Sequence, residues 1–114
     1  MNKLKILKTA KHLVSLLVQG DYDELISLSN GIRLQASEMK KALAEYPATF
    51  IMPDNIVFED FDVIEIAESD PPKYSVDIDL WSEEEGRSDL TLQTTMIESE
   101  KEIMAVEIDD IHVL

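Results

Sequence analysis

The chain contains no cysteine, only three glycines and a single tryptophan. The lack of cysteine excludes disulfide bonds, thiolate metal ligands and cysteine nucleophiles. Gly20, Gly31 and Gly86 lie too far apart to form a loop that cradles phosphate groups. No serine stands in a Gly-x-Ser-x-Gly nucleophile elbow. The sequence therefore gives no support to the common kinds of nucleophilic catalysis.

Basic residues are scarce, above all in the second part of the chain. Residues 54–114 hold 19 acidic and three basic residues, whereas residues 1–53 hold five acidic and seven basic ones. The two parts carry formal charges of −16 and +2, which add to the total of −14. Phosphate backbones need a basic footprint, and the chain offers only a short run of lysines near its start. We therefore expect no nucleic-acid partner and favour a basic protein partner.

Long apolar runs are also missing. No window reaches the ~18 apolar residues of a membrane span. The lysines within residues 1–18 interleave with apolar residues at helical spacing, and no small-x-small cleavage site stands near Gln19 and Gly20. This segment therefore lacks the pattern of a signal peptide. We expect a cytoplasmic protein with no membrane partner.

The composition indicates one folded domain. With 114 residues, of which 45% are hydrophobic, the chain is long enough for a single core and too apolar for disorder despite its charge. We expect a single domain over residues 1–114, with a helical part (1–53) and a sheet part (54–114). The acidic residues should therefore lie on a folded surface.

Three helices are predicted in the helical part. Residues 3–18 repeat apolar residues at spacings of three and four, and a solvent-facing side carries Lys5, Lys8, His12 and Ser15. Gly20 should end this helix.

Asp21 and Glu24 form a capping-box-like start for a second helix, 22–29, which Asn30 and Gly31 should end. Ser37 is the predicted N-cap of a third helix, 38–46, with an apolar stripe of Met39, Ala42, Leu43 and Tyr46.

The pattern then changes to that of four strands, predicted at 61–68, 73–81, 88–97 and 103–109. The second alternates strictly, with Tyr74, Val76, Ile78 and Leu80 facing inward. The next two should face the core with Leu90, Leu92, Met96, Met104, Val106 and Ile108.

Strand 61–68 carries apolar residues on both faces, so it is either covered on both sides or an edge strand against a loop. The tail, residues 111–114, should extend the last strand or dock on the core. The prediction is an α+β fold, with two to three N-terminal helices on one face of a four-stranded antiparallel meander.

The outward row of the central hairpin is the main candidate for a binding site. If the strands pair around loop 82–86, Asp77 and Asp79 lie across from the segment that holds Arg87, Asp89 and Gln93. Trp81 lies on the same face, and tryptophan and arginine are enriched among interface anchors. The alternative is a solvated sheet face with modest cross-strand ion pairs. The sequence leaves both interpretations open.

Other site chemistries are less well supported. Asp77 and Asp79 could form a catalytic carboxylate pair, but no pattern indicates the pocket that would raise one pKa. Asp109, Asp110 and His112 could bind a metal, but their spacing is not diagnostic. Residues 83–86 lack the alternating ligands of a calcium loop. We expect no enzymatic activity, no cofactor and no metal site.

Several segments carry a family resemblance: SNGIRL (29–34), SDPPKYSV (69–76), DLWSEEEGRSDLTL (79–92) and VEIDDIHVL (106–114). They resemble a family of small bacterial proteins of unknown function. The order of elements is similar to that of the cystatin-like and NTF2-like folds. The acidic single-domain build is similar to the immunity proteins of bacterial toxin systems, including contact-dependent growth inhibition.

The resemblance implies an immunity-type protein, monomeric or weakly dimeric, that neutralises a cationic toxin, such as a nuclease domain. Carboxylates would compete with substrate phosphates for toxin cations, with Trp81 as the buried anchor and Arg87 fixing orientation. The acidic set is Asp77, Asp79, Glu83, Glu84, Glu85 and Asp89. The alternative is an NTF2-like protein that binds or converts a small molecule in a pocket lined by Tyr74, Tyr46 or His12.

Overall fold

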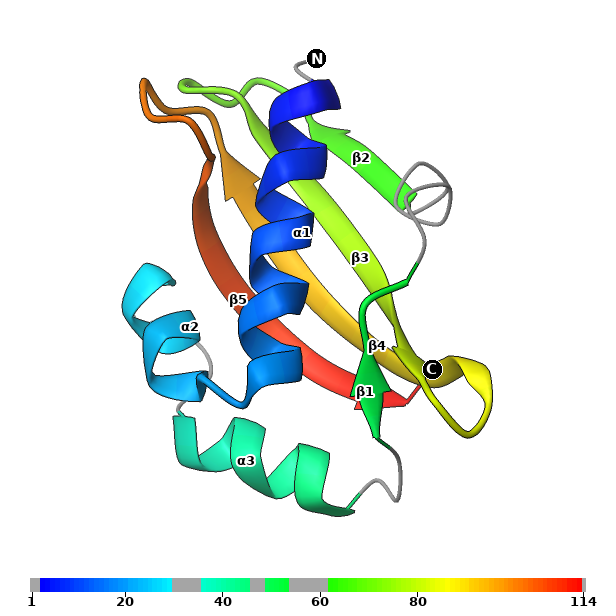
Figure 1. The fold of residues 1–114 in the computed structure, drawn as a ribbon. Coiled ribbons are helices and arrows are strands. Elements are labelled where there is room, and N and C mark those ends of the chain that lie inside the picture. Colours follow the sequence, from blue (N-terminus) through cyan, green and yellow to red (C-terminus); the bar gives the residue numbers. More distant parts are fainter. Residues whose placement is uncertain (1–2, 30–35, 46–48, 54–61, 114) are drawn as a thin grey trace.

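The computed structural model of the chain describes residues 3–29, 36–45, 49–53 and 62–113. Within them, three helices precede five strands (Figure 1). The helices are α1 (Lys3–Gln19), α2 (Tyr22–Leu28) and α3 (Ala36–Glu45). The strands are β1 (Phe50–Ile51), β2 (Asp62–Ile66), β3 (Lys73–Ser82), β4 (Gly86–Ile97) and β5 (Ala105–Val113).

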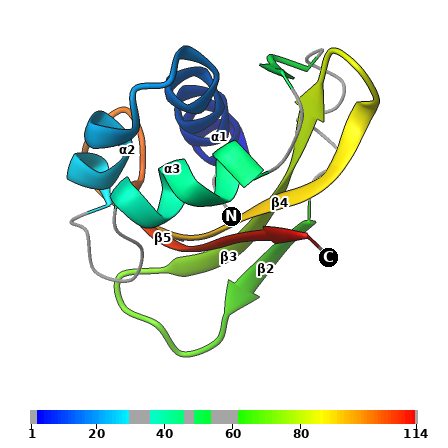
Figure 2. The same cartoon turned by 90° about the horizontal axis from the view of Figure 1, so that it is seen from below.

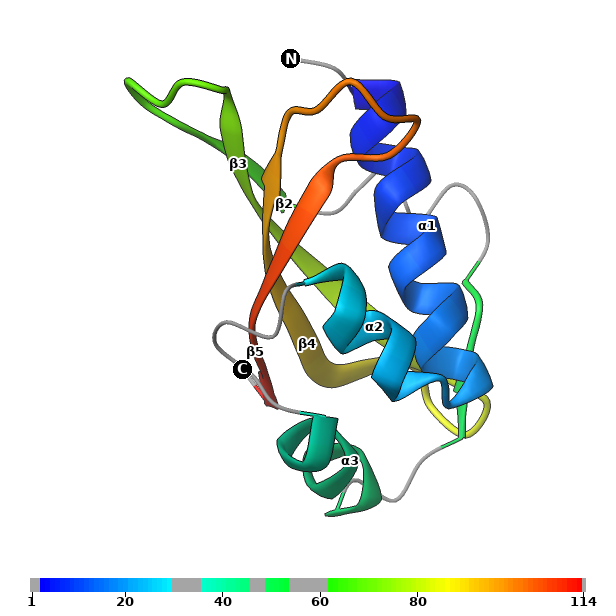
Figure 3. The same cartoon turned by 90° about the vertical axis from the view of Figure 1, so that its left-hand side faces the viewer.

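All described strands belong to one antiparallel sheet. Its order is β1-β3-β4-β5. β2 pairs with the same edge of β3 as β1 does, but β2 lies beside the start of β3 and β1 beside its end. Figures 2 and 3 show the helices on one side of the sheet, with α1 running along it. The opposite side, here called the outer face, carries no described helix. The predicted α+β class and the helices on one face are confirmed.

The apolar residues that recur along one face of α1 pack into the core. Ile6, Ala10, Leu13 and Leu17 are each at most 2% exposed, as their spacing predicted. Gly20 ends the helix with a φ of +78°, a conformation that glycine adopts without steric cost. Its N–H donates to the Leu17 carbonyl over 3.1 Å, in the manner of a helix C-cap.

The short helices follow their predicted caps in part. The Asp21 carboxylate accepts a hydrogen bond from the Glu24 N–H over 3.4 Å at the start of α2. The prediction of Ser37 as N-cap is wrong, because α3 begins at Ala36 and Ser37 lies in its first turn. The helix therefore begins two residues before the predicted start at Glu38, and alanine has the strongest helix propensity of any residue. The buried stripe of Met39 and Leu43 is confirmed. The predicted helix ends at Asn30, Gly31 and Tyr46 lie outside the described residues.

The core-facing rows of the sheet match the predicted alternation. On β3, every second residue is buried, from Tyr74 to Ser82. The predicted inward residues of β4 and of the last strand region are also buried, at 3% exposure or less: Leu90, Leu92, Met96, Met104, Val106 and Ile108. A period of two therefore located the core side of all three strands.

The number and length of the strands differ from the prediction. β1 was missed, because two residues are too short to show any period; they pair with Trp81 and Ser82 of β3. The last strand continues to Val113, so the apolar tail extends it, as one of the two alternatives had it.

β2 is shorter than predicted and pairs only with β3 among the described strands. Coverage of both its faces is wrong for Ile64 and Ile66, which are 65% and 39% exposed. Its position at the edge of β3 agrees with the other alternative. Phe61 lies outside the described residues.

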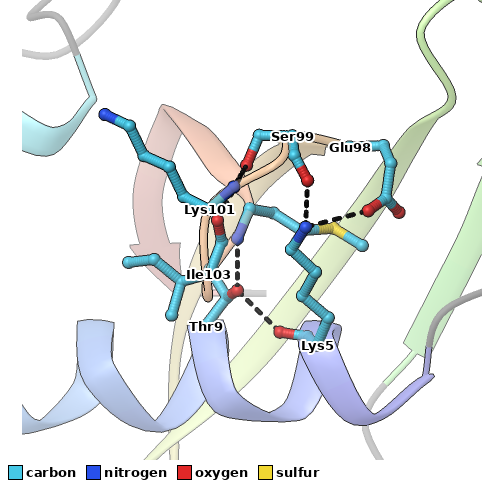
Figure 4. Close-up of polar contacts among 7 residues, drawn as sticks. Lys5, Thr9, Glu98, Ser99, Lys101 and Ile103 are labelled. Carbon is cyan, nitrogen blue, oxygen red and sulfur yellow. Dashed lines mark hydrogen bonds and ion pairs between the residues drawn. The ribbon is translucent and has the colours of Figure 1, made fainter.

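Lys5 departs from its predicted solvent-facing position. Its side chain is only 12% exposed and pairs with the Glu98 carboxylate over 3.0 Å (Figure 4). It also donates to the Ser99 carbonyl. The turn between β4 and β5 folds over this part of α1 and brings these acceptors together, which the helical period alone does not reveal.

Among the described residues, no helix is both long and apolar enough to cross a membrane.

Candidate functional site

The register of the central hairpin brings the predicted outward row together. Across β3 and β4, Asp77 lies opposite Gln93, Asp79 opposite Thr91, and Trp81 opposite Arg87. The predicted cross-strand arrangement is therefore confirmed. We call the outer-face side chains of Asp77, Asp79, Trp81 and Arg87 the β3–β4 patch.

Asp79 joins two neighbours on the next strand. One carboxylate oxygen accepts a hydrogen bond from the Thr91 hydroxyl over 3.2 Å, and the other lies 3.7 Å from Nη1 of Arg87. The Asp79 and Arg87 side chains are 42% and 71% exposed. An ion pair this exposed adds little to stability, so the guanidinium can exchange this partner for another at small cost.

Trp81 has a partly buried ring with an unused donor. The indole Nε1 is buried and has no hydrogen-bond partner among the described residues. Tryptophan N–H groups normally find an acceptor when they are buried. The ring lies over Gly86, where an added Cβ would be 3.6 Å from Cζ3. Trp81 is therefore an apolar surface with a hydrogen-bonding capacity that the described fold does not use.

The hairpin loop is tied to the segment before β1. The Thr49 N–H donates to both carboxylate oxygens of Glu84, over 2.8 and 3.0 Å. This hydrogen bond from the Thr49 backbone is the main reason that the pKa of Glu84 is lowered, against a smaller desolvation effect. The Glu83 N–H donates to the Thr49 carbonyl over 2.8 Å. Glu83, Glu84 and Glu85 are all exposed, so this loop adds negative charge beside the β3–β4 patch.

A further acidic neighbour was missed by sequence reasoning. Asp62 of β2 lies directly opposite Asp77, so two carboxylates occupy adjacent positions on the outer face. Like charges directly opposite each other destabilise a sheet. The apolar residues on both faces of strand 61–68 concealed which face Asp62 would share. The side chain of Asp89, also predicted at this site, lies outside the described residues.

The carboxylates considered as metal ligands have other partners. Asp109 Oδ2 accepts a hydrogen bond from the Thr95 hydroxyl over 2.8 Å, and Asp110 Oδ1 accepts from the Ile111 N–H over 2.9 Å. Within the described part of the chain, no three histidine, aspartate or glutamate side chains are grouped to hold a metal ion. The His112 side chain lies outside that part.

The surface pockets formed by described residues include two that border the helices. One of about 300 Å³ lies between α2 and the turn that precedes β5. The other, of about 370 Å³, is lined from α1, α2, α3 and β1, with Tyr22 and Lys40 among its polar groups.

Neither pocket is lined by Tyr74 or His12, two of the three residues whose presence in a cavity would favour the small-molecule alternative. Tyr74 is instead 4% exposed within the core. Burial, followed by the charges of Glu65 and Glu98, raises its pKa. His12 is exposed, and Tyr46 lies outside the described residues.

A family model described as Domain of unknown function (DUF7668) matches residues 14–114. No curated protein and no solved structure matches the chain.

Proposed function

Because the chain belongs to the DUF7668 family of domains of unknown function, whose description states no activity, we propose a function from its own surface. The protein is an immunity-type inhibitor that binds and neutralises a cationic bacterial toxin. The β3–β4 patch and the adjoining acidic loop form the binding surface. The favoured toxin is a nuclease domain delivered by contact-dependent inhibition. Carboxylates on this surface would pair with the basic groups of the nuclease that otherwise bind substrate phosphates.

The observation that carries this proposal is the partly buried ring of Trp81, whose Nε1 has no hydrogen-bond partner among the described residues. A partly buried indole offers apolar area to a partner, and its buried Nε1 becomes available as a donor only if the ring turns outward on binding. It is flanked by Asp79 and Arg87, whose mutual ion pair is exposed and readily exchanged. Interface hot spots are enriched in tryptophan and arginine, and combine a desolvated anchor with a polar rim.

The negative net charge of the molecule supports a positively charged partner. A net charge of −14 repels anionic and attracts cationic surfaces, which raises the association rate at low salt. Asp62 lies directly opposite Asp77, which adds to the acidic character of the outer face. We therefore expect rapid, salt-sensitive association with a basic toxin domain.

The test uses a toxin domain encoded in the reading frame next to this one. Expressed in bacteria with and without the protein, the toxin domain should arrest growth only when the protein is absent. The double variant Trp81→Ala with Asp77→Ala should lose protection and bind at least about 30-fold more weakly, since hot-spot truncations cost about 2 kcal/mol or more. Isothermal titration calorimetry measures the affinity.

The matched control is Leu4→Ala with Asp23→Ala. It also removes one large apolar side chain and one exposed carboxylate, but from α1 and α2. This variant should keep full protection and affinity. Equal affinity of the patch variant and the wild type would rule out the β3–β4 patch. Failure of the protein to protect against any neighbouring toxin would rule out the immunity function.

A second candidate is a small-molecule binder with a cystatin-like or NTF2-like fold. The pocket of about 370 Å³ beside Tyr22 and Lys40 favours it, because this volume falls within the ligand-site range of roughly 300–1,000 Å³. The inhibitor proposal is preferred because the interior between α1 and the sheet is filled by apolar side chains.

A further inference from the structure

The edge strand β2 offers a backbone for pairing. All five of its residues, Asp62–Ile66, pair with β3, and no described strand pairs with its other edge (Figures 1 and 2). Strand edges present unpaired N–H and C=O groups to any chain that can add a strand. Short length and charge limit this hazard here, but they do not remove it.

The outer side of this strand is unusually apolar for its exposure. Ile64 is 65% exposed, and Ile66, two residues along on the same face, is 39% exposed. Their cross-strand neighbours on β3 are Ser75 and Lys73, which do not cover them. Natural edge strands usually place charges or proline at such positions. Two exposed isoleucines beside an edge therefore indicate a contact surface.

The charges on β2 distinguish between possible occupants. Asp62 lies on the outer face, whereas Glu65 lies on the helix-facing side opposite Tyr74. A carboxylate that points inward on an edge strand discourages self-association. A second copy would also bring a further net charge of −14 to the same surface. An antiparallel pairing of two copies about Ile64 would set Ile66 against Asp62, which leaves the isoleucine without an apolar neighbour.

We propose that the β2 edge accepts an extended, basic and apolar segment of the partner as an added antiparallel strand. This inference takes the cationic partner from the proposed function and specifies how its backbone binds. Opposite residues 66 to 62, the segment would read apolar, basic, apolar, apolar, basic. Its basic residues would face Glu65 and Asp62, and its apolar ones would cover Ile64, Ile66 and Val63. Main-chain hydrogen bonds would supply affinity, and these cross-strand pairs would supply specificity.

The test uses a synthetic fluorescent peptide with the order Thr-Val-Lys-Val-Val-Lys-Thr and a counterpart with glutamate in place of both lysines. Fluorescence anisotropy should show at least tenfold tighter binding of the basic peptide. Hydrogen exchange should show new protection of amides within residues 62–66 when the basic peptide is added.

The variant Ile64→Lys should weaken binding of the basic peptide at least tenfold, because it places a cation and removes an apolar contact at the centre of the edge. Leu4→Lys is the matched control, since Leu4 is 64% exposed on α1 and the charge change is identical. It should change binding less than twofold. Circular dichroism of both variants should match the wild type.

Three results would overturn the proposal: protection of β5 amides in place of β2, equal binding of the acidic peptide, or a dimer in sedimentation that Ile64→Lys abolishes. The last result would make a second copy the occupant. The patch variant Trp81→Ala with Asp77→Ala separates the two proposals. If toxin binding depends on Trp81 but not on Ile64, the inhibitor function stands and the added strand is wrong.

Discussion

At the scale of single residues, Thr9 connects two distant parts of the molecule. It is 0% exposed. Its hydroxyl accepts a hydrogen bond from the Met104 N–H over 2.9 Å and donates to the Lys5 carbonyl over 2.7 Å (Figure 4). The Met104 N–H lies just before β5, and the Thr9 hydroxyl is a buried acceptor for it. One side-chain oxygen thus holds α1 against the turn between β4 and β5.

Thr9→Val should destabilise the protein by about 1–3 kcal/mol, the cost of leaving a buried donor unpaired. Valine has nearly the same shape, so the loss reports the hydrogen bond and not a cavity. Urea unfolding measures the change, and hydrogen exchange should show faster exchange of the Met104 amide. Thr9→Ser, which keeps the hydroxyl, should retain slow exchange at Met104. Equal exchange in both variants would contradict this role of the hydroxyl.

The buried rows were predictable residue by residue because a period of two or 3.6 fixes which side chains share a face. Lys5 was not predictable in this way. Its burial depends on Glu98 and Ser99, which lie more than 90 positions away. Likewise, the sequence placed Trp81 on the outer face, but only the packed hairpin shows that its Nε1 is buried without a partner.

At the scale of elements, the β3–β4 hairpin is shaped by its irregularities. The register shifts between Asp79 and Trp81, and Gly86 turns the chain with a φ of +74°. Bulges increase twist and re-aim side chains at functional edges. The combination sets Trp81 over Gly86 and beside Arg87. The geometry of the proposed anchor therefore depends on this turn.

Gly86→Ala should destabilise the protein by roughly 1–2 kcal/mol, the cost of a left-handed conformation for a residue with a Cβ, and should change Trp81 fluorescence. Gly20→Ala is the matched control, because Gly20 has a φ of +78° and no atom within 4 Å of an added Cβ. It should cost a similar free energy and leave the emission spectrum unchanged. Identical spectra for both variants would show that the turn does not position the indole.

Element boundaries were predictable where a local signal marks them, as at Gly20 and Asp21. They were not predictable where pairing alone decides. The two residues of β1 form a strand because Trp81 and Ser82 offer them a partner edge. The tail of β5 becomes a strand through its pairing with residues 90–92 of β4.

At the scale of the whole molecule, charge opposes compactness. Folding gathers a net charge of −14 within a radius of gyration of 13.4 Å, and the mutual repulsion destabilises the compact state. Ion pairs such as Lys5 with Glu98 and Arg87 with Asp79 offset part of this repulsion. Screening by salt should therefore favour the folded protein.

Raising NaCl from about 0.01 to 0.5 M at neutral pH should increase the free energy of unfolding by about 1 kcal/mol or more, since the Debye length falls well below molecular dimensions. Urea unfolding at each salt concentration measures it. The increase should shrink toward the isoelectric point near 4.3, where the net charge vanishes. A stability that falls with salt at neutral pH would mean that attractive pairs dominate the electrostatics.

The residues of the candidate site were largely predictable from the sequence. Alternation assigned them to one face of the sheet, and the loop at 82–86 indicated that the strands on either side of it pair. The neighbourhood of the site was not predictable. Asp62 and the two exposed isoleucines join the same face only through the register of β2, which no local pattern determines. Sequence reasoning therefore located the patch but not its extension to the edge.

The contact between α1 and the region before β5 has a consequence for folding during synthesis of the chain. Thr9 and Met104 are 95 residues apart in sequence, so a ribosome makes the helix long before the strand region that covers its buried oxygen. Just before that point, β2, β3 and β4 are already made, but the sheet lacks β5 and the Met104 N–H that donates to Thr9. A chain that ends before Met104 would lack β5 and would leave the Thr9 hydroxyl without this backbone donor.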